Sequence, residues 1–185
     1  MANLAARIPD ALRLEAGDPN FDTPDHILDG AARAATDGFT KYTLSNGYVS
    51  LRELIVDKLR ERNGLECSAD EVVVTTGGCG GLFTTLLVLL DPGDEVLVPD
   101  PGWANYPPMI HVQSATPIGY PLDPHRGFDP DFDRLESLVG ERTKAIIVNS
   151  PGNPTGAVQP DEVQAELGRI AAEHGLAVIS DEIYE

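Results

Sequence analysis

The sequence is short of basic residues and of cysteine. Its 185 residues contain 13 Lys and Arg against 30 Asp and Glu, which gives a formal net charge of −17. A surface this acidic repels phosphate backbones and anionic lipid head groups, so we expect neither nucleic acid nor a membrane surface as a partner. Two cysteines, Cys67 and Cys79, are too few for a disulfide framework. Reduced thiols of this kind are typical of a cytoplasmic protein.

Long apolar runs are also absent. The longest, around Leu86 to Leu90, is far shorter than the roughly 20 residues that a membrane-spanning helix needs. The first ten residues hold no continuous apolar stretch, so no signal peptide is predicted. Hydrophobic residues nevertheless make up 42% of the chain, close to the globular norm of about 45–50%, so we expect a buried core.

What the chain does contain is an alternation of β-branched apolar runs and amphipathic stretches. Strands are predicted at 71–75, 95–98, 115–118, 144–149 and 176–180. Helices are predicted at 24–36, 47–62, 82–90, 104–112, 129–139 and 160–174. This order predicts an α/β fold whose mostly parallel sheet carries helices on both faces. Ligands bind such sheets at the carboxyl ends of the strands, so the candidate chemistry is sought there.

Two candidate segments follow the earlier strands. The glycine-rich turn Gly77–Gly81 precedes a helix, where free backbone amides and the helix dipole favour a phosphate. It matches neither the dinucleotide fingerprint nor the Walker pattern, and an ordinary tight turn is the alternative. Trp103 follows the second strand in a Pro/Gly loop, where a flat aromatic ligand could stack on it. Core packing is the commoner role of a lone tryptophan.

Two further segments follow the later strands. The loop 149–156 contains two X-Pro units, and the bond between Asn153 and Pro154 is a candidate for the cis form. Asp181 ends the last strand, where a partly buried carboxylate needs a cation or several hydrogen-bond donors. A structural ion pair is the alternative there. Tyr184 lies three residues further on, and we expect it to reach the same cavity.

Together these segments resemble the pyridoxal-phosphate-dependent aminotransferases of class I/II, which have fold type I of aspartate aminotransferase. Asn153–Gly156 and Asp181–Tyr184 resemble the two most specific motifs of that family. Leu14–Pro24 resembles its N-terminal substrate loop, and residues 41–52 resemble its Tyr-Thr segment. The resemblance implies transfer of an amino group between an amino acid and a 2-oxo acid, with pyridoxal 5′-phosphate as the cofactor.

The resemblance also implies roles for the cofactor-binding residues. Gly77, Gly78 and Cys79 would hold the phosphate, although the family often has Ser, Thr or Lys where this chain has Gly77 and Cys79. That departure leaves the phosphate to backbone amides. Trp103 would stack on the pyridine ring, and Asp181 would pair with its protonated nitrogen. The cationic ring then accepts the electrons released when the substrate Cα loses its proton.

Four residues complete the implied site. Asn153 and Tyr184 would hydrogen-bond the phenolic oxygen of the cofactor. Gly17 would contact the substrate carboxylate, with Trp103 and Asn153 also in the substrate site. Tyr42 would reach the phosphate of a neighbouring subunit, which implies a homodimer.

Two residues of the family are absent, the lysine that forms the Schiff base and the C-terminal arginine that binds the substrate α-carboxylate. In the family the lysine lies beyond the Asp-Glu-Ile-Tyr motif, whereas the lysines of this chain are Lys41, Lys58 and Lys144. The catalytic residue is therefore unknown. We predict that residues 41–185 are the first part of the large cofactor-binding domain, an incomplete domain. Residues 1–40 are predicted to form an N-terminal arm or part of the small domain, and the chain alone is expected to be inactive.

Three hypotheses stay open on the sequence. The first is an aminotransferase, of which this chain is a truncated form or a fragment. The second is a carbon–sulfur lyase or another β-eliminating enzyme of the same fold, because such enzymes share the Asn153 and Asp181 motifs. The third is a non-catalytic remnant, or one half of a split enzyme that assembles with a separately encoded C-terminal half.

Overall fold

The computed structural model describes residues 7, 8, 10, 12, 17 and 19–184, and the chain divides into two compact units, Met1–Leu44 and Ser45–Glu185. The first unit carries helix α2 (Asp25–Thr36), which confirms the helix predicted there. Pro24 precedes the helix with the restricted backbone angle that suits a helix start, and Asp25 lies where the helix dipole favours an anion. The predicted domain boundary between residues 40 and 41 stays a prediction.

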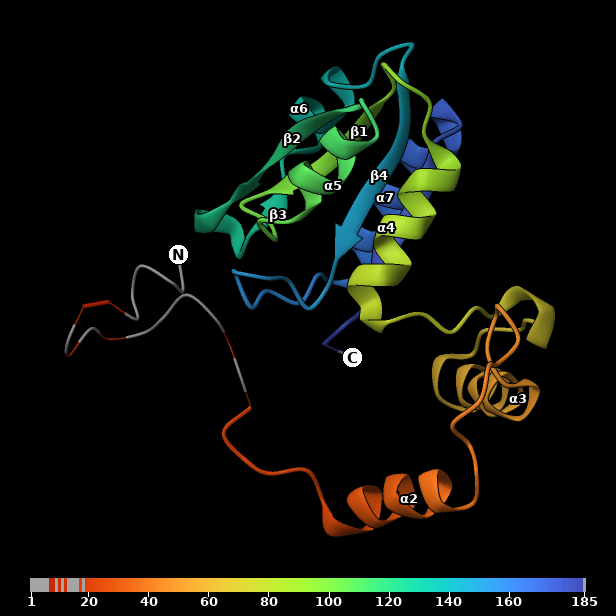
Figure 1. Cartoon of the computed structure of the whole chain (residues 1–185). Helices are drawn as coiled ribbons and strands as arrows, with labels where there is room; N and C mark the ends of the chain where they lie inside the picture. Colours follow the sequence, from red (N-terminus) through yellow and green to blue (C-terminus); the bar gives the residue numbers. More distant parts are fainter. Residues whose placement is uncertain (1–6, 9, 11, 13–16, 18, 185) are drawn as a thin grey trace. The chain divides into compact units, whose positions relative to one another are not determined.

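The second unit is built on a five-stranded sheet with the strand order β3-β2-β1-β4-β5 (Figure 1). Its strands are β1 (Glu95–Asp100), β2 (Thr116–Asp123), β3 (Asp129–Pro130), β4 (Thr143–Asn149) and β5 (Ala177–Asp181). All pairings are parallel except that of β3 with β2. The mostly parallel α/β sheet predicted from the sequence is confirmed, and the carboxyl ends of its four longer strands meet at one edge.

Among the described residues of the second unit, two α-helices precede β1 in the chain and three connect the strands. They are α3 (Val49–Lys58), continued by a π-helical turn (Leu59–Asn63), then α4 (Gly77–Leu89), α5 (Tyr106–Val112), α6 (Phe132–Ser137) and α7 (Asp161–His174). Short 3-10 turns cover Ala69–Glu71 and Pro124–Arg126. Gly64 and Gly175 end α3 with its extension and α7 in the left-handed conformation that glycine adopts without strain.

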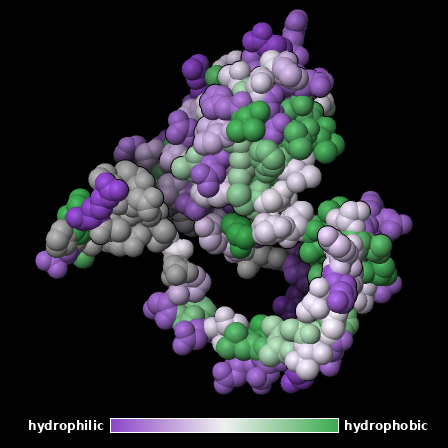
Figure 2. All heavy atoms as spheres, in the orientation of Figure 1, coloured by the Kyte–Doolittle hydropathy of each residue, from purple (hydrophilic) through white to green (hydrophobic). Residues whose placement is uncertain are grey.

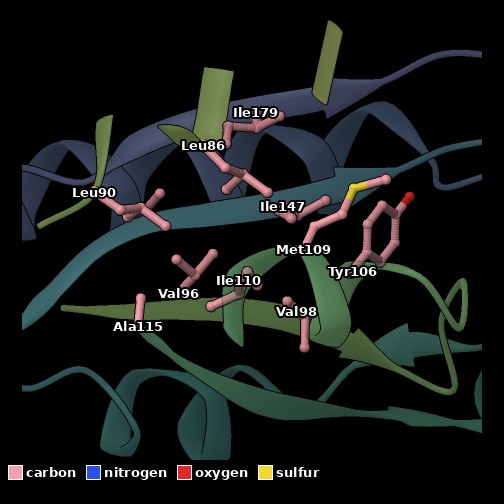
Figure 3. Close-up of a cluster of buried hydrophobic side chains, with 11 residues drawn as sticks. Leu86, Leu90, Val96, Val98, Tyr106, Met109, Ile110, Ala115, Ile147 and Ile179 are labelled. Carbon is pink, nitrogen blue, oxygen red and sulfur yellow. The ribbon is translucent and has the colours of Figure 1, made fainter. Parts of the chain in front are cut away.

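Two clusters of buried side chains lie on opposite faces of the sheet. The first, which we call cluster 1, joins α4 and α5 to one face, and Figure 3 shows Leu86 of α4, Ile110 of α5 and Ile147 of β4 among its members. The second, cluster 2, joins α6 and α7 to the other face, where Ile146 of β4 meets Leu167. Consecutive residues of β4 therefore serve opposite faces, which explains its continuous apolar sequence.

The strand predicted at 71–75 is wrong. Residues 69–71 form a 3-10 turn, and Val72 is extended but has no place in the sheet. The amide of Val74 donates instead to the carbonyl of Asn46 at 3.1 Å. A β-branched run becomes part of a sheet only where a neighbouring strand offers backbone hydrogen bonds. Among the described residues, no strand pairs with this run.

The helix predicted over 129–139 is shorter than expected. Residues 129–130 pair with β2 as β3, and the helix begins only at Phe132. The carboxylate of Asp131 accepts a hydrogen bond from the amide of Arg134 at 3.0 Å, which is a side-chain cap at the helix N-terminus. The local cap therefore decides where strand gives way to helix.

The surface of the protein is mixed in character. Figure 2 shows hydrophilic side chains over much of the second unit, with hydrophobic ones among them. Val88 of α4 is 83% exposed and Val178 of the edge strand β5 is 51% exposed. Among the described residues, no helix is both long and apolar enough to cross a membrane.

Candidate active site

A cavity of about 240 Å3 lies at the carboxyl edge of the sheet. Its lining residues come from the start of α4, from α5 and the loop before it, and from the segments around the ends of β4 and β5: Gly78, Cys79, Leu82, Trp103, Tyr106, Asn149, Asn153, Asp181, Ile183 and Tyr184. Six of the eight predicted cofactor residues are among them. The exceptions are Gly77, which lies just before Gly78, and Tyr42, which belongs to the first unit.

The glycine-rich segment is the first part of α4 rather than a turn before it. Gly77 begins the helix with a φ of +70°, and its amide donates to the carbonyl of Thr75 at 2.9 Å. This left-handed conformation lets the chain change direction from the extended residues before it. The next two amides, those of Gly78 and Cys79, have no acceptor within the helix because they lie in its first turn. Both residues face the cavity.

Asp181 has the hydrogen-bond donors that its position demands. The Tyr106 hydroxyl donates to Oδ2 of Asp181 at 2.7 Å, and the Ile183 amide donates to Oδ1 at 3.3 Å. Asn149, its register partner on β4, donates from Nδ2 to the Asp181 carbonyl at 2.9 Å. Within the described part of the chain, the carboxylate is held by neutral donors and forms no ion pair, which leaves its charge available to a cation in the cavity.

The loop after β4 brings a second polar pair to the cavity. Asn153 donates from Nδ2 to the Tyr184 hydroxyl at 3.0 Å, and its own amide donates to Oδ1 of Asn149 at 2.8 Å. The bond between Asn153 and Pro154 is cis, as predicted, and so is that between Ser150 and Pro151. Asn149 thus ties the loop to the end of β5 and sets the spacing of the polar groups.

Trp103 lies between the core and the cavity, and its stacking on a ligand stays a prediction. It packs against cluster 1 from a partly buried position and also lines the cavity. Its ring meets that of Tyr106 edge-on, with centroids 5.3 Å apart and an interplanar angle of 79°. Its ring is therefore oriented by a buried neighbour.

Sequence reasoning missed two polar residues of the cavity. Asn149 ends β4 within the segment that was singled out, so its position at a strand end was the available signal. Tyr106 begins α5, three residues after Trp103, so its place in the segment that follows β1 was the available signal. Gly17 and Tyr42 belong to the first unit, and their roles stay predictions.

Basic and metal-binding groups are scarce around the cavity. No lysine of residues 45–184 lines it, since Lys58 ends α3 and Lys144 lies near the start of β4. Within the described part of the chain, no group of three or more His, Cys, Asp or Glu side chains could hold a metal ion. Cys67 and Cys79 are both free thiols.

The two buried tyrosines make the stability of the fold sensitive to alkali. Burial, and then the hydrogen bond to Asp181, raise the pKa of Tyr106, and burial raises that of Tyr120. Unfolded tyrosines ionise near pH 10, so above about pH 10 the unfolded state holds fewer protons than the native one. The contribution of the two tyrosines to the free energy of unfolding is complete below about pH 10. Above about pH 10 it falls by up to about 1.4 kcal/mol per pH unit per tyrosine.

Urea unfolding between about pH 9 and about pH 11 measures this loss. The Tyr120→Phe variant is expected to lose stability less steeply than the wild type over that range, because it lacks one of the two groups. Equal slopes for the two proteins would contradict the expectation.

Comparison with known proteins agrees with the fold. Residues 9–185 match the family model of aminotransferase class I and II. A probable aspartate/prephenate aminotransferase of Thermus aquaticus is 45% identical over 176 residues, which cover 95% of this chain and 46% of that protein. The aspartate/prephenate aminotransferase of Thermus thermophilus is 46% identical over the same length, with the same coverage.

Solved structures give the same result. A tetra mutant of Thermus thermophilus aspartate aminotransferase matches with a TM-score of 0.90 at 46% identity, covering 93% of this chain and 47% of that one. A Pyrococcus protein designated A1 matches with a TM-score of 0.95 at 37% identity, and the match covers 100% of this chain and 48% of that one. The chain thus spans about half the length of the relatives it matches. It belongs to the class I and II aminotransferases, a family that in general depends on pyridoxal 5′-phosphate.

Proposed function

We propose that the protein transfers an amino group between an amino acid and a 2-oxo acid, with pyridoxal 5′-phosphate held in the cavity at the carboxyl edge of the sheet. The observation that carries the proposal is the convergence of an anionic acceptor, two neutral donors and an aromatic ring on one cavity. These groups are Asp181, Asn153 with Tyr184, and Trp103. When bound, the cofactor supplies a cationic ring that accepts electrons as the substrate Cα loses its proton.

The donor set of the cavity fits this cofactor. Asp181 offers a carboxylate to a protonated ring nitrogen, and its two protein donors leave lone pairs unused because a carboxylate has about four acceptor sites. Asn153 already donates to the oxygen of Tyr184, so the hydroxyl proton of Tyr184 is left to donate toward a phenolic oxygen. Trp103 offers an aromatic ring on which a pyridine can stack.

The phosphate end rests on the start of α4. Gly78 and Cys79 bring backbone amides and the positive end of the helix dipole to the cavity. Neither side chain carries a cation, so the amides and the dipole supply the attraction. A negative charge introduced beside these amides should therefore weaken the binding of the phosphate.

The names of the relatives support a narrower proposal for the substrate. Several relatives are named as aspartate or aspartate/prephenate aminotransferases, including one of Geobacillus stearothermophilus at 41% identity. We therefore propose aspartate as an amino donor of the whole protein. Gly17, Trp103 and Asn153 are the substrate contacts proposed with it, and Tyr42 the contact to a second subunit of a homodimer.

The proposal is tested by titrating the chain with pyridoxal 5′-phosphate while following the emission of Trp103, its single tryptophan. Because Trp103 lines the cavity, saturable quenching is expected, with tighter binding of pyridoxal 5′-phosphate than of pyridoxal. Since no lysine of residues 45–184 lines the cavity, borohydride is not expected to fix the cofactor to a stoichiometric lysine of this unit. Absence of any quenching would refute the proposal.

A substitution at Cys79 sharpens the test. Cys79→Asp places an anion beside the phosphate. The first turn of α4 has no acidic residue and its dipole favours one there, so the helix should be retained. We expect about a tenfold or greater loss of affinity for pyridoxal 5′-phosphate and little change for pyridoxal. Cys79→Ala is the matched control and should bind both compounds as the wild type does. Equal losses for both compounds in Cys79→Asp would place the phosphate elsewhere.

A further inference from the structure

One buried side chain contacts two of the functional groups of the cavity. Tyr106 is 1% exposed, its hydroxyl donates to Oδ2 of Asp181 at 2.7 Å, and its ring meets Trp103 edge-on at 5.3 Å. Figure 3 shows it beside Met109, at the end of cluster 1 opposite Leu90. Tyr106 therefore connects the packed core to the carboxylate and to the aromatic side chain of the cavity.

We propose that Tyr106 is a positioning residue, which holds the Asp181 carboxylate in the orientation that pairs with a ring nitrogen and seats Trp103 beside it. The inference rests on the proposed function, because it concerns how the same cavity recognises the ring. It assigns to α5 a role in the site as well as in the core.

The contacts of Asp181 support this role. Its two carboxylate oxygens each accept one hydrogen bond, Oδ2 from Tyr106 and Oδ1 from the amide of Ile183. Donors on both oxygens fix the plane of the carboxylate, whereas a single donor leaves it free to turn. The Ile183 amide lies two residues along the same turn and at the longer distance, 3.3 Å. Tyr106 is 75 residues away in sequence, so its hydrogen bond ties the carboxylate to the core.

Tyr106 is suited to act as a permanent donor. Burial and the hydrogen bond to Asp181 raise the pKa of Tyr106 above its ordinary value, so its hydroxyl keeps its proton at neutral pH. The edge-on contact with Trp103 depends on the ring alone, so the two functions of Tyr106 can be separated by removing only the hydroxyl.

The test compares two ligands that differ only at the ring nitrogen. They are pyridoxal 5′-phosphate and its 1-deaza analogue, in which carbon replaces that nitrogen, and both are titrated by quenching of Trp103. The wild type is expected to prefer the nitrogen compound. In Tyr106→Phe, which keeps the ring against Trp103, we expect this preference to fall by about 3- to 10-fold, since one bond to the charged group is lost. A loss of packing alone would weaken both ligands by the same factor.

Tyr120→Phe is the matched control. Tyr120 is also fully buried and its hydroxyl donates to the carbonyl of Ile147 at 2.9 Å, but it belongs to cluster 2 and does not line the cavity. The ligand preference of this variant should equal that of the wild type. Circular dichroism establishes that each variant is folded.

The possible outcomes are distinguishable. An unchanged preference in Tyr106→Phe, or equal weakening of both ligands, overturns the positioning role and leaves the proposed function standing. Loss of the native fold in Tyr106→Phe but not in Tyr120→Phe also overturns it, because Tyr106 would then serve the core alone. A wild type that binds neither ligand refutes the proposed function, and the inference with it.

Discussion

Asp181→Asn is expected to weaken the binding of pyridoxal 5′-phosphate by about 10- to 100-fold, because hydrogen bonds to charged groups contribute about 1.5–3 kcal/mol. The amide has the shape of the carboxylate but no charge to offer a protonated ring nitrogen. Tyr106 can still donate to the remaining oxygen, whereas the new amide nitrogen faces the amide of Ile183, whose longer hydrogen bond of 3.3 Å is lost. Quenching of Trp103 measures the dissociation constant, and the 1-deaza analogue should bind the variant and the wild type alike.

Asp100→Asn provides the control for this experiment. Asp100 ends β1 at the same edge of the sheet, as Asp181 ends β5, but it does not line the cavity. Both variants therefore remove one negative charge from the same edge. Equal weakening by the two substitutions would mean that the general field of the sheet edge, rather than a pairing with Asp181, attracts the ligand.

The largest effect on stability is expected for Ile147→Ala. Ile147 is 0% exposed in cluster 1, on a strand that pairs with β1 on one side and β5 on the other. Truncation removes buried methyl groups and leaves a cavity that a central strand cannot close, so the free energy of unfolding should fall by about 2–5 kcal/mol. Folded domains are stable by only about 5–15 kcal/mol, so this is a large fraction of the total. The midpoint of urea unfolding measures it.

Val178→Ala is the corresponding control on the neighbouring strand. Val178 lies on β5, in register with Ile146, and is 51% exposed. Its truncation should change the free energy of unfolding by less than about 1 kcal/mol. A comparable loss in both variants would mean that burial of Ile147 against the helices is not what makes its truncation costly.

Local sequence was sufficient to predict those elements whose signals are local. The apolar run of β4 and the amphipathic pattern of α7, ended by Gly175, predicted both elements nearly to their observed bounds. The Pro-rich loop after β4 and the carboxylate at the end of β5 predicted where the polar groups would meet. Each of these depends on residues within one turn or strand, or on the rule that parallel strands end at one edge.

Other features depended on groups far apart in the chain. The run 71–75 has the composition of a strand but lies outside the sheet, because a strand needs a hydrogen-bonded neighbour that composition does not supply. The glycines 77–81 read as a turn but start α4, where the packing of residues such as Leu86 outweighs the low helix propensity of glycine.

By itself, the sequence determined the α/β class of the protein, the family motifs and six of the side chains and backbone positions that line the cavity. Only the tertiary structure decided that Tyr106, 75 residues from Asp181 in sequence, donates to its carboxylate. The physical reason is that pattern and spacing specify which face of an element is buried. The partner of a buried hydroxyl is specified by how whole elements pack, and here that packing brings α5 against the end of β5.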